Sequence, residues 1–271
     1  MIRQAIIPLA GLGTRLLPLT SVFAKELLPM NGKVGIQYIL DECIEAGIKE
    51  VIFIISKKKM IIKDYFYKDN FYKNIIKKKK DKRILEEYKK ILKYKKMIKF
   101  VYQNKPLGTG DAVIKTQKFI KDKYFLMLLP DDLIIKKNCS REMIKISLKN
   151  KCSVMASMRV KKNNVTRWGI YSVSKKINKK NFIINDVIEK PSINEAPSSY
   201  AVIGRYVLSK KIFSKLKNLK SGKGGEIHIT DAIRKLIYDG EKFIGHNFNG
   251  KYLDCGSMSG YIKSGLEISK I

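Results

Sequence analysis

The chain has 271 residues, long enough to bury a large core and close to the upper end of what one α/β domain reaches. Its formal net charge of +32 would suit a nucleic-acid partner, but lysine is spread over the whole chain and no aromatic-glycine RNA-binding pattern accompanies it, so we expect no specific nucleic acid. No apolar run approaches the roughly 18 residues that span a bilayer, so we also expect no membrane partner.

The cysteines argue against a zinc site. Cys43, Cys139, Cys152 and Cys255 form no CxxC pair, and only two histidines accompany them, too few for a finger-type site. Reduced thiols fit this set best, so we expect a cytoplasmic protein.

Strand-like and helix-like runs alternate through the first half of the chain. The predicted strands are 4–9, 51–55, 99–102 and 124–129. A helix over 36–46 is indicated by apolar residues that share one face and by Gly47 beyond its end. Further helices are predicted over 81–97, as an exposed excursion, and from about residue 111 to 120. This alternation is typical of a parallel sheet covered by helices.

After residue 160 the sequence changes to scattered short strands separated by polar turns. The predicted elements are strands at 169–173, 183–188, 200–208 and 243–248, and helices at 229–238 and 258–268. We interpret this half as a second lobe laid against the sheet, with neither repeats nor a long linker.

A glycine-rich bend follows the first predicted strand. Gly11 and Gly13 lack side chains, so backbone N–H groups there can approach a phosphate closely, and Arg15 adds a fork of donors suited to phosphate oxygens. A Walker loop is excluded because the chain contains no Gly-Lys-Ser/Thr triplet. A dinucleotide fingerprint is excluded because Leu16 stands where a third small residue is needed. The sequel KELLP at 25–29 places a cation and an acid a few residues beyond the bend.

These and later motifs occur in the order of a known family. AGLGTRLLPLT, KELLP and IQYILDECIEAGIKEVIF resemble the sugar-phosphate nucleotidyltransferase superfamily. Within it, EKP at 189–191, APSSYAVIGRYVL at 196–208, GGEIHITDAI at 224–233 and LDCG at 253–256 resemble the bacterial UTP glucose-1-phosphate uridylyltransferases. The similarity runs from Ile2 to about Leu266.

The resemblance implies a Rossmann-like, three-layer α/β/α core with a mixed, mainly parallel sheet and a small β-rich sugar-binding elaboration. It implies one nucleotidyltransferase domain over 1–271, in which 1–135 mainly binds the nucleotide, 150–256 is mainly the sugar-phosphate-binding lobe, and 257–271 is a C-terminal helix. The implied reaction joins UTP and glucose 1-phosphate to give UDP-glucose and pyrophosphate, with Mg²⁺ as cofactor. The family also implies a homo-oligomer, either a dimer or a tetramer.

The resemblance assigns roles to the glycine bend and to residues after it. The implied nucleotide-binding residues are Ala10, Gly11, Gly13, Glu26, Gln103 and Gly108. Arg15 would bind the triphosphate beside Gly13, and Lys25 would neutralise the phosphates around the reacting α-phosphorus. Glu26 and Gln103 would hydrogen-bond the base, as would backbone at Gly108.

Metal and sugar sites are implied in the same way. Asp131, after the predicted strand 124–129, and Asp254 of LDCG would hold Mg²⁺, which takes one or two carboxylates plus substrate phosphates. Aspartates at strand ends can also be simple loop caps. The implied sugar-phosphate-binding residues are Gly169, Glu189, Lys190 and Gly204, with the glutamate on the sugar hydroxyls and the lysine on the phosphate.

Departures from the family pattern keep other hypotheses open. Asp111 stands where the family usually has histidine, and an acid there recurs in relatives that use other nucleotides, so dTTP or ATP, or another hexose 1-phosphate, is a second hypothesis. A non-catalytic regulatory homologue, or a basic protein that binds nucleic acid, is a third. Ala24, Val34 and Gly35 replace a proline-containing pattern and predict a softer loop around Lys25, with lower turnover.

Overall fold

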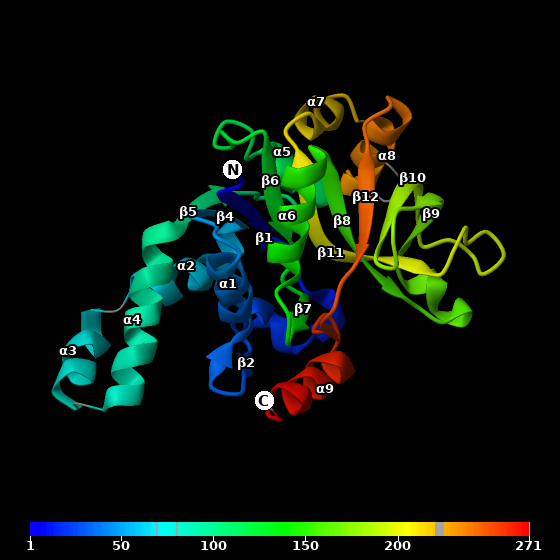
Figure 1. Ribbon diagram of the computed structural model, residues 1–271. Helices are drawn as coiled ribbons and strands as arrows, with labels where there is room; N and C mark the ends of the chain where they lie inside the picture. Colours follow the sequence, from blue (N-terminus) through cyan, green and yellow to red (C-terminus); the bar gives the residue numbers. More distant parts are fainter. Residues whose placement is uncertain (69, 80, 220–224, 271) are drawn as a thin grey trace.

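Within the described residues, which are 1–68, 70–79, 81–219 and 225–270, nine strands of the computed structural model form one mixed sheet (Figure 1). In order across the sheet these are β5 (Ile98–Tyr102), β4 (Glu50–Ile55), β1 (Gln4–Pro8), β6 (Tyr124–Leu128), β11 (Tyr200–Ser209), β8 (Ser153–Arg159), β12 (Phe243–Asn247), β10 (Asn181–Glu189) and β9 (Gly169–Lys176). Gly224, which opens the GGEIHITDAI motif, and Ile271, at the end of the predicted C-terminal helical segment, lie outside the described residues.

Parallel pairing holds the first half of the sheet together. β1 runs parallel to β4, with Ala5 opposite Val51, and parallel to β6, with Ala5 opposite Leu126. β4 in turn runs parallel to β5. The four strands predicted for this half are confirmed. Because the carboxyl ends of parallel strands share one edge of the sheet, the loops that follow these strands meet there.

Strands from the second half of the chain extend the same sheet. β11 lies between β6 and β8 and pairs antiparallel with both, Tyr206 being opposite Met127 and Met155. β12 is parallel to β8, and β10 is antiparallel to β12 and β9. The prediction of a second lobe laid against the sheet is therefore wrong. The backbone groups at the free edge of β6 need hydrogen-bond partners, and β11 supplies them. The later strands therefore continue the same sheet.

Helices cover both faces of the sheet and complete the predicted three layers (Figure 1). The helices of the described residues are α1 (Gly35–Glu45), α2 (Met60–Tyr67), α3 (Asn70–Lys79), α4 (Lys82–Met97), α5 (Thr109–Ile114), α6 (Cys139–Asn150), α7 (Ile212–Lys217), α8 (Ile229–Tyr238) and α9 (Met258–Ile268). Because successive strand residues point to opposite faces, Ala5 and Ile7 join the apolar core under α1, α2, α4 and α6, whereas Ile6 joins the core under α5, α7 and α8.

Several elements differ from the prediction. α5 ends earlier than expected, because the Thr116 hydroxyl donates to the carbonyl of Val113 at 2.7 Å and the chain continues as turns. α6 was not predicted, because its buried face includes Ser140 and Ser147, which interrupt the apolar periodicity. α2, α3, α7 and β8 were also not predicted.

The excursion between β4 and β5 consists of α2, α3 and α4, and α3 extends away from the sheet (Figure 1). Asp81 caps α4, its side chain accepting from the Ile84 N–H at 3.1 Å. Tyr94 of α4 is buried, and its hydroxyl donates to Asp41 of α1. None of these helices, nor any other in the described part of the chain, is both long and apolar enough to span a membrane.

Short elements shape the edge of the sheet where the loops meet. They are two small antiparallel pairs, β7 (Asp132–Ile135) with β13 (Lys251–Asp254) and β2 (Pro29–Met30) with β3 (Lys33–Val34), and the 3₁₀ turns η1 (Thr14–Leu16), η2 (Leu19–Ser21), η3 (Lys25–Leu27), η4 (Lys57–Lys59) and η5 (Lys162–Arg167).

A buried ion pair ties α1 to β11. The Arg205 side chain is completely buried, and its Nε and Nη2 donate to the Glu42 carboxylate at 2.8–3.1 Å. Arg205 Nη1 donates to the carbonyl of Leu129, and the Ser140 hydroxyl donates to Glu42. Neither charge can be removed without leaving the other unpaired in a low-dielectric interior.

We predict that Glu42→Gln lowers the free energy of unfolding by about 3 kcal/mol, because it leaves the buried Arg205 charge uncompensated. Urea unfolding followed by circular dichroism measures the change. Glu86→Gln is the matched control, since Glu86 forms an exposed ion pair with Lys89 and its loss should not move the midpoint. Equal stability of the Glu42→Gln variant and the parent chain would contradict the prediction.

Candidate active site

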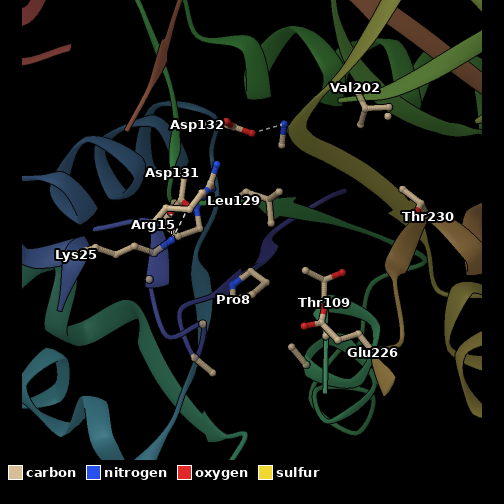
Figure 2. A pocket seen from close by; sticks show the side chains of 18 of the residues that line it. Pro8, Arg15, Lys25, Thr109, Leu129, Asp131, Asp132, Val202, Glu226 and Thr230 are labelled. Carbon is tan, nitrogen blue, oxygen red and sulfur yellow. Dashed lines mark hydrogen bonds and ion pairs between the residues drawn. The ribbon is translucent and has the colours of Figure 1, made fainter. Parts of the chain in front are cut away.

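The loops at the carboxyl edge of the parallel strands enclose a cavity of about 790 Å³ (Figure 2). Every residue that the sequence analysis predicts for the site lines this cavity. These residues are Ala10, Gly11, Gly13, Arg15, Lys25, Glu26, Gln103, Gly108, Asp131, Gly169, Glu189, Lys190, Gly204 and Asp254. The fold therefore brings motifs from the whole length of the chain to one place.

The glycine bend after β1 is fixed by its own backbone. Gly13 has φ of +71°, in the left-handed region, and its carbonyl accepts from the Leu16 N–H and the Thr20 hydroxyl, both at 2.9 Å. A Cβ at Gly13 would also lie 3.1 Å from Thr20 Cγ2. A Cβ at Gly11 would meet nothing within 4 Å, so the space beside this backbone is open to a ligand.

Two cations converge on Asp131 (Figure 2). Lys25 Nζ donates to Asp131 Oδ1 at 2.5 Å, and Arg15 Nη2 lies 3.6 Å from Asp131 Oδ2. The Lys25 side chain is 15% exposed, whereas the Arg15 side chain is 68% exposed. Arg15 is therefore free to swing toward an incoming anion, while Lys25 is held in place.

Asp254 lies close to Asp131 on the cavity wall. The Cys255 N–H donates to the carbonyl of Asp131 at 2.7 Å, which ties the two segments together. Asp254 Oδ1 accepts from the Gly256 N–H at 2.9 Å, and its Oδ2 lies 3.4 Å from Arg167 Nη2. Each of the two carboxylates predicted to bind a metal thus has a basic side chain beside it.

Asp132 joins three strands beside these carboxylates. Its Oδ2 accepts from the Gly204 N–H of β11 at 2.8 Å, the dashed line in Figure 2, and its Oδ1 accepts from the Tyr252 hydroxyl of β13 at 2.7 Å. Burial raises the pKa of Asp132, although both of these hydrogen bonds act in the opposite direction. Because Asp132 follows Asp131 directly, its bonds fix the backbone from which the Asp131 carboxylate projects.

Hydrogen bonds give the amide of Gln103, another cavity-lining residue, a defined orientation. Gln103 Nε2 donates to the carbonyl of Gly108 at 3.1 Å and to Asp111 Oδ2 at 2.7 Å. Asp111 also accepts from Lys115 at 3.0 Å. With both amide protons donated, the amide oxygen of Gln103 is the atom with which a base entering the cavity can pair.

Glu26 forms a buried ion pair with Lys59 of η4. Lys59 Nζ donates to both carboxylate oxygens of Glu26, at 2.8 and 2.9 Å. Burial raises the pKa of Glu26 and lowers that of Lys59, while the pairing opposes both shifts. The pair fixes η3, the turn that also carries Lys25.

The part of the cavity wall predicted to bind the sugar phosphate contains a strained lysine. Lys190 has φ of +46°, unusual for a residue with a side chain, and its N–H donates to the carbonyl of Trp168 at 3.1 Å. Beside it, a Cβ at Gly169 would lie 3.1 Å from Glu189 Oε2, so only glycine leaves the Glu189 carboxylate its present position.

Several residues that line the cavity or pair with a residue that does were not predicted from the sequence. They are Lys59, Asp132, Arg167, Trp168 and Tyr252. Lys59 ends a run of three lysines and has no local signal that distinguishes it. Asp132 could have been found, since it adjoins Asp131 in the Leu-Pro-Asp-Asp sequence after β6. Arg167 and Trp168 directly precede the predicted strand that begins at Gly169, and this position was the available signal.

Comparison with known proteins identifies the family. A family model described as "Nucleotidyl transferase" matches residues 4–270. The chain belongs to the nucleotidyl transferase family. This nucleotidyltransferase is 37% identical over 274 residues to the UTP–glucose-1-phosphate uridylyltransferase of Bacillus subtilis, an alignment that covers 99% of this chain and 91% of that protein.

Solved structures agree with this assignment. The nucleotidyltransferase superposes on a UDP-glucose pyrophosphorylase complexed with UDP-glucose with a TM-score of 0.87 and 33% identity, over 100% of this chain and 99% of the other. It superposes on the UTP-bound enzyme from Acinetobacter baumannii with a TM-score of 0.89 and 31% identity, over 99% and 93% of the two chains. The predicted Rossmann-like α/β fold is therefore confirmed.

We predict that Gly204→Ala disrupts the cavity wall. A Cβ at Gly204 would lie 2.6 Å from Leu129 Cβ and closer still to Asp132 Oδ2, so β11 or the turn before β7 must move. Overpacking of this kind lowers the free energy of unfolding by about 1–3 kcal/mol. Chemical unfolding measures this loss.

Gly265→Ala is the matched control for this prediction. Gly265 lies in α9, where a Cβ would meet nothing within 4 Å, so alanine should leave stability unchanged or raise it slightly. Equal stability of Gly204→Ala and Gly265→Ala would show that β11 is not closely packed against Asp132 and Leu129 at Gly204.

Proposed function

We propose that this nucleotidyltransferase joins UTP and glucose 1-phosphate to give UDP-glucose and pyrophosphate. The observation that supports this most directly is the single cavity lined by Arg15, Lys25, Asp131, Lys190 and Asp254. A glycine bend with open space beside it lies at the same cavity. The names of the relatives described above point to the same pair of substrates.

The reaction that we propose is an in-line substitution at the α-phosphorus of UTP. A phosphate oxygen of glucose 1-phosphate forms the new P–O bond, and the bond from the α-phosphorus to the bridging oxygen breaks, so pyrophosphate leaves with that electron pair. The attacking oxygen is already anionic, so no protein nucleophile or base is needed. The protein has to align two anions and reduce their repulsion, and Arg15, Lys25 and Lys190 are the cations that we assign to this task.

Base selection follows from the orientation of Gln103. Its amide oxygen can accept the N3–H of uracil or thymine, and we assign the Gly108 backbone and Glu26 to the same base. Adenine offers no imide N–H at the corresponding edge. We therefore favour UTP over ATP, and we expect dTTP to be the closer competitor.

The donor set fits Mg²⁺. Two carboxylates, Asp131 and Asp254, line the cavity on segments joined by the hydrogen bond from the Cys255 N–H to the Asp131 carbonyl, and Mg²⁺ takes one or two carboxylates and completes its shell with phosphates. Asp131 and Asp254 would hold it, and it would supply charge neutralisation on the phosphate oxygens. The same proposal places the enzyme in the cytoplasm, where thiols such as that of Cys43 stay reduced.

The proposal predicts that pyrophosphate is released only when UTP, glucose 1-phosphate and Mg²⁺ are all present. A coupled pyrophosphate assay, with each component omitted in turn, measures this. The same assay with dTTP, ATP and other hexose 1-phosphates tests the choice of substrates. A clear preference for another nucleotide would overturn the assignment of UTP, and no turnover with any pair would favour a non-catalytic protein.

We also predict that Lys25→Ala and Asp131→Asn each lower kcat by at least about 10²-fold, because the first removes a cation assigned to the reacting phosphates and the second removes a carboxylate assigned to Mg²⁺. Lys96→Ala is the control, since Lys96 is exposed on α4, away from the cavity. Circular dichroism should show all three variants folded. Full activity of either cavity variant would remove the proposed mechanism.

A further inference from the structure

A guanidinium that has no assigned role so far lines the cavity. Arg167 ends η5, its side chain is 58% exposed, and its Nη2 lies 3.4 Å from Asp254 Oδ2. The guanidinium carbon lies 4.8 Å from the ring centroid of Trp168, within the range of a cation–π contact. Stacking on this ring limits the directions in which the guanidinium plane can point.

The backbone that carries Arg167 belongs to the part of the cavity wall predicted to bind the sugar phosphate. Trp168, the next residue, accepts the hydrogen bond from the Lys190 N–H, and Gly169 follows beside Glu189. The strained Lys190 and the Arg167 segment are therefore held to each other. Arg15 and Lys25 contact Asp131 instead, and no contact ties them to the Lys190 backbone among those described above.

The charge of the proposed substrate calls for more than one cation in this part of the cavity wall. A phosphate monoester carries about −1.5 to −2 charges at neutral pH, and Lys190 supplies one positive charge. A guanidinium also presents paired N–H donors that match two phosphate oxygens, which an ammonium cannot do. Arg167 has both the charge and the geometry that Lys190 lacks.

The present partner of Arg167 does not prevent this role. The ion pair with Asp254 is long, at 3.4 Å, and more than half of the Arg167 side chain is exposed, so the pair is weak. A phosphate dianion in the cavity competes well for the guanidinium. Asp254 would then be free for the divalent cation assigned to it above.

We propose that Arg167 binds the phosphate of the sugar 1-phosphate together with Lys190. This inference rests on the proposed function, because it assigns a substrate contact within the same reaction. It makes Arg167 a residue that determines affinity for the phosphorylated sugar rather than for the nucleotide. It also implies that the weak ion pair between Arg167 and Asp254 is the arrangement before the substrate binds.

The test compares Arg167→Gln and Arg167→Lys with the parent chain. Loss of a charge-assisted contact should raise KM for glucose 1-phosphate by about tenfold to a hundredfold and leave KM for UTP unchanged. Arg167→Lys should recover part of the loss, since it keeps the charge but not the fork of donors. Arg159→Gln is the control, since Arg159 also lies over an aromatic ring, that of Tyr200, but does not line the cavity.

Equilibrium binding without turnover provides a second measurement. Calorimetry should show Arg167→Gln weakening the binding of UDP-glucose, which contains the sugar phosphate as a diester with one negative charge, with no change for UMP, which lacks it. An effect on UTP and UMP instead would assign Arg167 to the nucleotide and overturn the inference. No effect on any ligand would reduce it to a surface ion pair.

The outcomes also separate this inference from the proposed function. If the parent chain does not release pyrophosphate from UTP and glucose 1-phosphate, both are overturned. If the parent chain is active and Arg167→Gln has unchanged KM values, only the role of Arg167 is overturned. Thermal unfolding of Arg167→Gln should match the parent chain, because the exposed side chain contributes little to stability.

Discussion

The repulsion between two phosphate-bearing substrates is the constraint on which this structure depends. The cavity answers it with cations, but cations gathered without substrate would repel one another and be costly to hold. The structure pairs two of them with carboxylates at the cavity wall: Lys25 with Asp131 and Arg167 with Asp254. The charges thus stand in place before any substrate arrives, and little reorganisation is needed when phosphates replace carboxylates as their partners.

The pairs differ in burial, and burial separates their tasks. Arg205 with Glu42 and Lys59 with Glu26 are withdrawn from solvent and hold the wall together, since breaking either would leave a buried charge. Arg167 is largely exposed, so its partner can be exchanged at little cost. Lys25 lies between these extremes, fixed by η3 and directed at Asp131. Ion pairs between basic and acidic side chains therefore stabilise the fold where they are buried, and they leave a cation available for binding where they are exposed in the cavity.

What the sequence could predict depends on whether the signal was local. The glycine bend and Lys25 follow β1 closely, so a contiguous pattern was enough to place a cation beside the bend in advance. Asp131 follows β6, but its metal role was implied only by the resemblance to a family. Asp254 required the resemblance to a family, because nothing near it indicates a metal. Arg167 and Lys59 act through contacts with residues distant in the chain, and in a chain so rich in basic residues their types carried no information.

The fold shows the same limit. The strands after residue 160 were recognised, but their neighbours were not, because alternation along a strand says which face is buried and not which strand lies beside it. The insertion of β11 between β6 and β8 was therefore missed. That insertion is what places Gly204 against Asp132, and so it connects the second half of the chain to the metal-binding carboxylates that we propose.

Asp111 illustrates how a departure from a family pattern changes meaning once its contacts are known. Read from sequence, an acid at this position argued for another nucleotide. In the structure the carboxylate is held by Gln103 and Lys115, and among the described residues those that line the cavity include Gln103 but not Asp111. Any influence of Asp111 on the base is therefore exerted through the orientation of the Gln103 amide. An acceptor at position 111 draws the NH₂ group away from the cavity and turns the amide oxygen toward it, which suits a pyrimidine with an N3–H. The departure is thus compatible with the imide bases of UTP and dTTP and argues only against ATP among the nucleotides that the sequence left open.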